Sequence, residues 1–119
     1  MSEHAYHAYA QGLHLLEREH PHAAAVALER ARDLEPEQGS IRESLGRAYF
    51  RSGRFGEASR EFERAVEIDP VNDYAHFGLG LCLARRGERA AARGHLKLAV
   101  AMRPGVDHYT RALTQVSGD

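Results

Sequence analysis

The chain of 119 residues has little of what marks a secreted, membrane or metal-dependent protein. It has no tryptophan, and its single cysteine, Cys82, excludes an internal disulfide framework and a zinc site built on several cysteines. No apolar run approaches the ~20 residues that a membrane helix needs, and the N-terminal residues lack the basic start and apolar block of a secretory signal. We therefore expect one cytoplasmic domain, residues 1–119, with a reduced thiol and no membrane partner.

Positive charge comes almost entirely from arginine, because Lys97 is the only lysine. The formal net charge is −1, which argues against a nucleic-acid binder, since that class usually shows a basic excess. The acids gather towards the N-terminus and the bases towards the C-terminus. Because the planar guanidinium group favours two-point contacts with carboxylates, the composition favours acidic protein partners over nucleic acid.

Three prolines, Pro36, Pro70 and Pro104, stand at a constant spacing of 34 residues. Alignment of the chain on them produces further columns of like residues, namely Gly12, Gly46 and Gly80; Ala24, Ala58 and Ala92; Leu28, Phe62 and Leu96; and Ala31, Ala65 and Ala99. Agreement at so many columns with one period indicates an internal repeat.

Within each unit the apolar residues recur at helical spacing, and a break separates two helices. In the second unit Gly53 stands where a helix end favours a left-handed residue, and Pro70 ends the second helix because proline has no N–H to donate. One helical hairpin cannot bury both of its faces, so the units must stack to form a core.

The repeat resembles the tetratricopeptide repeat. The second unit carries the family pattern at Leu45, Gly46, Tyr49, Gly53, Phe55, Ala58, Phe62, Ala65 and Pro70. The first unit departs from it, with Glu19 for the turn glycine and Pro21 for the turn aromatic. The resemblance implies an all-α protein, a right-handed α-solenoid of three helical hairpins at about residues 5–38, 39–72 and 73–106.

Residues 107–117 predict a short capping helix after the third repeat. Tyr109, Ala112, Leu113 and Val116 follow helical spacing, and Asp107 is the expected N-cap. Such a helix would cover the exposed end of the third repeat, as stacked repeats require.

The resemblance also implies that the first helix of each hairpin lines a concave groove that binds a segment of a partner. The groove residues carried over to this chain are Tyr6, Tyr9, Leu13, Glu43, Arg47, Phe50, Arg51, Tyr74, Phe77, Leu81 and Arg85. Aromatics beside arginines suit an extended or helical segment with apolar anchors and acidic groups. The alternative is that Tyr6, Tyr9, Tyr74 and Phe77 only contribute to helix packing.

Relatives that bind the C-terminal carboxylate of chaperones use lysine, asparagine and arginine at fixed groove positions. The matching positions in this chain hold Tyr9, Leu13, Ser44, Tyr74 and Gly78. None of these side chains can form that clamp, so binding of chaperone tails is disfavoured.

No combination of residues predicts catalysis, a metal site or a cofactor. His4, His7 and His14 share one helical face, but no HExxH or CxxC motif accompanies them. Cys82 lies among apolar residues and is expected to be a small buried hydrophobe. Helix residues 55–68 alternate glutamates with arginines, including Glu61, which predicts ordinary surface ion pairs.

The sequence therefore predicts a non-catalytic module that binds another protein. The alternative is a self-assembling structural unit, head to tail or as a weak homo-oligomer, in which the acidic first repeat meets the basic end of a second copy.

Overall fold

The computed structural model describes residues 1–118, and they form seven helices without a strand. The helices are α1 (Glu3–Glu17), α2 (Pro21–Leu34), α3 (Gly39–Arg51), α4 (Phe55–Ile68), α5 (Asp73–Arg85), α6 (Arg89–Met102) and α7 (Asp107–Ser117). Each 34-residue unit is one antiparallel hairpin, α1–α2, α3–α4 and α5–α6. The all-α fold expected from the repeat is confirmed.

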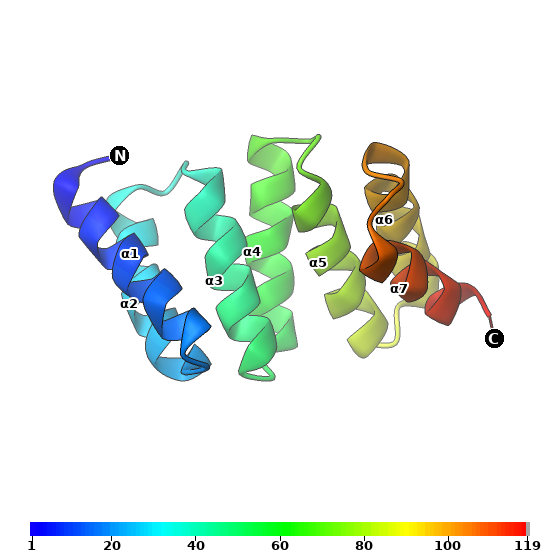
Figure 1. The fold of residues 1–119 in the computed structure, drawn as a ribbon, viewed down its shortest axis with the longest axis horizontal. Helices are drawn as coiled ribbons and strands as arrows, with labels where there is room; N and C mark the ends of the chain where they lie inside the picture. The colour runs from blue at the N-terminus through cyan, green and yellow to red at the C-terminus, as the bar shows by residue number, and fades with distance from the viewer. Residues whose placement is uncertain (119) are drawn as a thin grey trace.

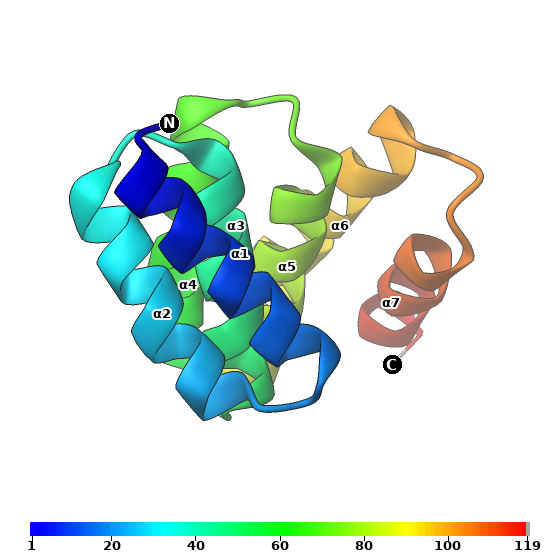
Figure 2. The ribbon, with the colours of Figure 1, turned by 60° about the vertical axis from the view of Figure 1, so that its left-hand side comes forward.

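The hairpins stack in chain order along the longest axis of the molecule, with the two termini at opposite ends (Figure 1). The extents of 45 × 25 × 23 Å describe an elongated array. α1, α3 and α5 form one layer and α2, α4 and α6 the other, while α7 follows α6 in the layer of the first helices (Figure 2). This layering makes the surface of α1, α3, α5 and α7 the face on which the predicted groove residues lie.

The glycine column explains how the two helices of each hairpin approach one another. A Cβ atom on Gly12 would lie 2.4 Å from Leu28, one on Gly46 would lie 2.9 Å from the Phe62 ring, and one on Gly80 would lie 2.7 Å from Leu96. The three large partners are at least 98% buried. Repeat periodicity in the sequence thus marks a repeated close contact in the core.

The turns inside the hairpins adopt a left-handed residue directly after the first helix. Gly53 has φ 77° and Gly87 has φ 82°, but the first hairpin places Glu19 there with φ 60°. A side chain in this region costs about 1–2 kcal/mol relative to glycine. The first repeat therefore has the same turn as the other two, and its backbone is strained at Glu19.

A buried ion-pair network joins the first repeat to the second and corrects one expectation. Glu61 of α4 is 6% exposed and accepts hydrogen bonds of 3.0 Å from both Arg32 of α2 and Arg42 of α3. Arg42 also donates to the carbonyl of Pro36, at 3.0 Å. The prediction that Glu61 makes only surface ion pairs is wrong, because the column it occupies faces the preceding repeat.

The equivalent positions of the third repeat hold a pair of histidines. His76 stands 34 residues after Arg42, His95 stands 34 after Glu61, and Pro70 stands 34 after Pro36. The His76 Nε2 atom lies 2.9 Å from the Pro70 carbonyl, and its Nδ1 lies 3.1 Å from Nδ1 of His95. Since a carbonyl only accepts, His76 donates from Nε2, and its Nδ1 accepts from His95.

Helix α7 closes the C-terminal end of the array. Tyr109 is 3% exposed, stacks on Phe77 with ring centroids 4.7 Å apart and donates a 2.6 Å hydrogen bond to Asp73. The predicted capping helix is confirmed, but its expected N-cap is wrong by one residue. Val106 occupies the N-cap and Asp107 is the first helical residue.

Candidate functional site

A pocket opens between α3 and α5 on the face that carries the predicted groove residues. Its cavity volume is about 40 Å³. We call it the inner pocket, and its lining residues are Arg47, Phe50, Arg51, Phe62, Tyr74, Phe77, Gly78 and Leu81. This volume is far below the roughly 300–1,000 Å³ that ligand pockets usually enclose, so the pocket suits one small apolar side chain rather than a cofactor.

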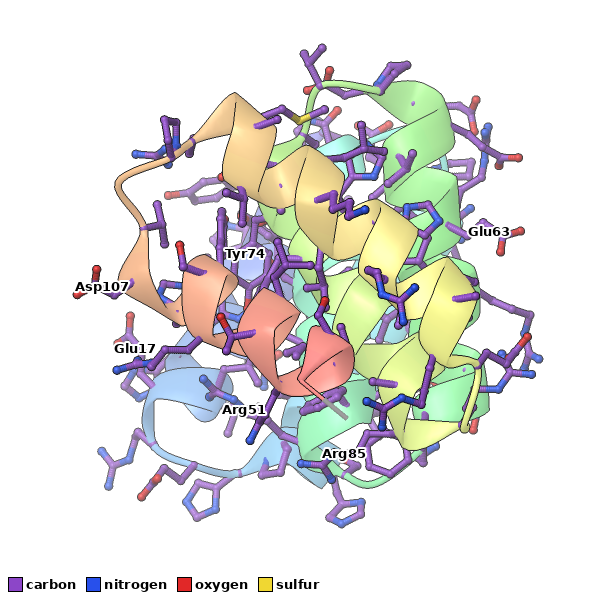
Figure 3. All side chains as sticks on the ribbon, turned by 90° about the vertical axis from the view of Figure 1, so that its right-hand side faces the viewer. Glu17, Arg51, Glu63, Tyr74, Arg85 and Asp107 are labelled. Atoms are coloured by element: carbon purple, nitrogen blue, oxygen red, sulfur yellow. The ribbon has the colours of Figure 1, made fainter. Side chains whose placement is uncertain are left out.

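A second, wider hollow adjoins the inner pocket at the end where the hairpin turns lie. We call it the outer depression, and its lining residues are Glu19, Pro21, Phe50, Arg51, Gly53, Phe55 and Arg85. Phe50 and Arg51 line both hollows. Figure 3 shows Arg51 and Arg85 towards the same end of the helices, with Tyr74 farther from that end.

Two arginines of these hollows, Arg47 and Arg85, contact aromatic rings. The guanidinium carbon of Arg85 lies 5.4 Å from the ring centres of both Phe50 and Phe55, and that of Arg47 lies 5.9 Å from the Tyr74 ring. Within residues 1–118 no carboxylate lies within ion-pair distance of Arg47, Arg51 or Arg85. Stacking orients the guanidinium groups and leaves their N–H edges available to an acidic ligand.

Burial shifts the pKa of two side chains near Arg47. It raises the pKa of the Glu43 carboxyl, although a hydrogen bond from Asn72 and the charge of Arg47 act in the opposite direction. Burial also raises the pKa of the Tyr74 hydroxyl, again opposed by Arg47. Glu43 accepts its bond from the Asn72 amide at 3.3 Å, so this acid is held to the neighbouring loop rather than presented to a ligand.

Not all of the predicted groove residues line the two hollows. Arg47, Phe50, Arg51, Tyr74, Phe77, Leu81 and Arg85 do so. Tyr6 is 59% exposed near the N-terminus and contacts the His7 ring, while Tyr9 is half-buried against the core of the first hairpins. Leu13 is half-buried and lines neither hollow. Phe77 is 8% exposed because α7 covers most of it.

Two aromatic residues of the hollows, Phe55 and Phe62, were assigned from the sequence only to framework columns. Phe62 lines the inner pocket and Phe55 the outer depression. Phe62 reaches the pocket through Gly78, where an added Cβ would lie 2.5 Å from its ring. The signal available in the sequence was that Gly78, a glycine outside the repeated glycine column, lies near the centre of a first helix.

The one cysteine of the chain, Cys82, lies in the hydrophobic core. Cys82 is fully buried, and burial raises the pKa of its thiol to about 11, which disfavours the thiolate needed for a nucleophile. The expectation of a buried hydrophobic cysteine is confirmed. In residues 1–118 no three histidines, cysteines, aspartates or glutamates converge in a way that could hold a metal ion.

No helix of residues 1–118 is both long and apolar enough to cross a membrane.

Comparison with known proteins agrees with the repeat geometry. A family profile described as "Tetratricopeptide repeat" matches residues 9–72 and 44–107. The matches together span most of the chain, so the protein belongs to the tetratricopeptide repeat family. A TPR repeat-containing thioredoxin, TTL4 of Arabidopsis thaliana, is 41% identical over 76 residues, 63% of this chain, but the match spans only 11% of that relative.

Solved structures share the whole architecture at low sequence identity. The first TPR domain of Spaghetti (RPAP3), bound to the HSP90 peptide SRMEEVD, superposes with a TM-score of 0.94 at 18% identity, covering 99% of this chain and 94% of that one. The Yersinia enterocolitica type III secretion chaperone SycD, in complex with a peptide of the translocator YopD, gives a TM-score of 0.83 at 19% identity, covering 99% and 90%. Such identities establish the fold, an α-solenoid of tetratricopeptide repeats.

Proposed function

We propose that this protein is a non-catalytic cytoplasmic module, acting as one domain, that binds an extended or helical segment of another protein on the concave face of α3 and α5. The observation that carries the proposal is the inner pocket, an apolar hollow beside Arg47 and Arg51, which form no ion pair within residues 1–118. Structural neighbours with peptide ligands, including an HSP90 peptide and a YopD peptide, support this use of the fold.

The expected ligand has apolar anchors and acidic groups. Chaperone tails remain disfavoured, because Ser44 and Gly78 are buried and Tyr9, Leu13 and Tyr74 carry no positive charge. A free C-terminal carboxylate would therefore meet none of the clamp side chains of the chaperone-binding relatives. The acidic group of this ligand would instead meet Arg47 or Arg51.

Affinity capture with matched charge reversals tests the proposal. The double variant Arg47→Glu, Arg51→Glu reverses charge beside the inner pocket, whereas Arg60→Glu changes an exposed arginine on α4. We expect wild type and Arg60→Glu to retain the same partner from an extract of the source cells and the double variant to lose it. Equal retention by all three proteins, with unchanged circular dichroism, would contradict groove binding.

Self-association is the second candidate, and one observation favours it. A shallow hollow at the N-terminal end is lined by Gln11, Leu15, Ala23, Val26, Ala27 and Arg30, and Val26 is 68% exposed. The corresponding end surface on α7 presents Thr110, Arg111, Thr114 and Gln115. Sedimentation of wild type and Val26→Glu at two salt concentrations tests the idea, because a salt-insensitive monomer in both cases excludes it.

A further inference from the structure

The inner pocket and the outer depression form one continuous surface with two chemical characters. Phe50 and Arg51 belong to both, so a ligand that fills one hollow reaches the other within a few residues. Consecutive Cα atoms of an extended chain advance by about 3.3 Å. A single short segment of a partner can therefore contact both the inner pocket and the outer depression.

The floor of the inner pocket is apolar and built from rigid residues. Phe62 is 2% exposed and its ring lies against the backbone of Gly78, while Leu81 is half-buried. A polar side chain that reached this floor would lose hydration and gain no hydrogen bond from the side chains of Phe62, Gly78 or Leu81. The pocket therefore selects an apolar side chain.

The outer depression brings two guanidinium groups to one hollow. Arg85 is positioned by Phe50 and Phe55, and Arg51 donates to the carbonyl of Leu16 at 3.4 Å. The acid among the lining residues is Glu19, which leaves the hollow with an excess of one positive charge. Within residues 1–118 neither Arg51 nor Arg85 forms an ion pair, so these arginines favour a ligand that supplies a carboxylate.

We infer that the partner is recognised through an internal segment in which an apolar side chain enters the inner pocket and an aspartate or glutamate two or three residues away binds Arg51 and Arg85. This inference rests on the proposed function and assigns positions within it. The charge complementarity of the outer depression selects the acidic residue, and the apolar floor of the inner pocket selects its neighbour. Specificity then depends on the spacing of the two.

A random twelve-residue peptide library displayed on phage provides the probe, with the full chain as bait. We expect enriched peptides to carry leucine, isoleucine or phenylalanine two or three positions from an aspartate or glutamate. The best peptide is then synthesised with an amidated C-terminus, so that its only carboxylates are side chains. Fluorescence anisotropy measures its Kd, together with that of the peptide whose acid is changed to the amide.

A double-mutant cycle assigns the acid to the two arginines. We expect the amide peptide to bind about tenfold more weakly, as for the loss of a charge-assisted hydrogen bond. The variant Arg51→Gln, Arg85→Gln should weaken the acidic peptide by a similar factor and leave the amide peptide nearly unchanged. Arg60→Gln on α4 is the matched control and should bind both peptides as wild type does.

A separate variant of the inner pocket distinguishes this inference from the proposed function. If Leu81→Gln weakens binding but Arg51→Gln, Arg85→Gln does not, the groove function stands and the assignment of the acidic residue is overturned. If neither variant weakens binding, or if the selection enriches no peptide, both proposals fail. Circular dichroism melts of every variant show that the loss is one of binding rather than of folding.

Discussion

Nδ1 of His76 lies 3.1 Å from Nδ1 of His95 at the position where the preceding repeat pairs Arg42 with Glu61. The two imidazole rings are nearly parallel, with an interplanar angle of 24°. The third repeat thus replaces an ion pair between a guanidinium group and a carboxylate with a hydrogen-bonded pair of imidazole rings. The same scaffold position therefore carries an ion pair in the second repeat and two imidazoles in the third.

Acidification should destabilise the protein through His95. Burial lowers the pKa of His95, and His76 lowers it further, while Glu63 acts in the opposite direction. The folded pKa lies below the unfolded value of about 6.5, so the unfolded chain binds more protons in that interval and the free energy of unfolding decreases as pH falls through it. Urea denaturation at pH 7.5 and 5.5 should show a smaller pH effect in His95→Gln than in wild type. An equal effect would contradict the prediction, and His4→Gln controls for an exposed histidine.

Glu19→Gly should stabilise the protein by about 1 kcal/mol. Its left-handed backbone disfavours any residue with a Cβ atom, whereas glycine adopts it freely. The reciprocal change, Gly53→Ala in the second repeat, should destabilise by about 1 kcal/mol. Thermal melts followed by circular dichroism compare the two, and a lower melting temperature for Glu19→Gly would argue against strain at this turn.

Two glycine-to-alanine changes in the third repeat should change the stability of the protein in opposite directions. An added methyl group on Gly80 would lie 2.7 Å from Leu96, whereas one on Gly94 of α6 would meet no atom within 4 Å. Gly80→Ala should therefore cost about 1–3 kcal/mol through overpacking, and Gly94→Ala should add roughly 0.5–1 kcal/mol of helix stability. Chemical denaturation measures both, and equal effects would show that the crossing of α5 and α6 tolerates separation.

Removal of the Glu61 charge should cost more than removal of a surface glutamate on the same helix. Glu61→Gln leaves Arg32 and Arg42 without their shared carboxylate, and we expect a loss of about 2 kcal/mol. Glu67 pairs with Arg64 on the surface, so Glu67→Gln should change stability by less than about 0.5 kcal/mol. The urea midpoints of the two variants show whether the ion-pair network between the first two repeats contributes to stability.

The framework was predictable because each column has one steric role. Each hairpin needs a glycine where its first helix meets a large side chain of its second helix. The sequence therefore repeats this glycine, as Gly12, Gly46 and Gly80. Glu61 was misplaced because helical charge spacing does not reveal which face meets the previous repeat. The distinction depended on its neighbours Arg32 and Arg42, which come from other helices.

The groove residues were less predictable, because their exposure depends on contacts between helices that the repeat pattern does not encode. The repeat pattern places Phe77 at a groove position, but Tyr109 of α7 covers the Phe77 ring. Phe55 was assigned to a turn, although its ring helps to position Arg85. The His76–His95 pair was overlooked because the two residues are neither neighbours in the chain nor part of a known motif.

The ring of Phe62 belongs to two repeats at once. It lies against the backbone of Gly46 in its own hairpin and of Gly78 in the next, so α5 cannot separate from α4 without breaking a contact that also holds α3. Repeat arrays ordinarily open one unit at a time, but this shared ring makes the second and third repeats cooperative. Amide hydrogen exchange should accordingly find α3, α4 and α5 opening together, with α7 exchanging first.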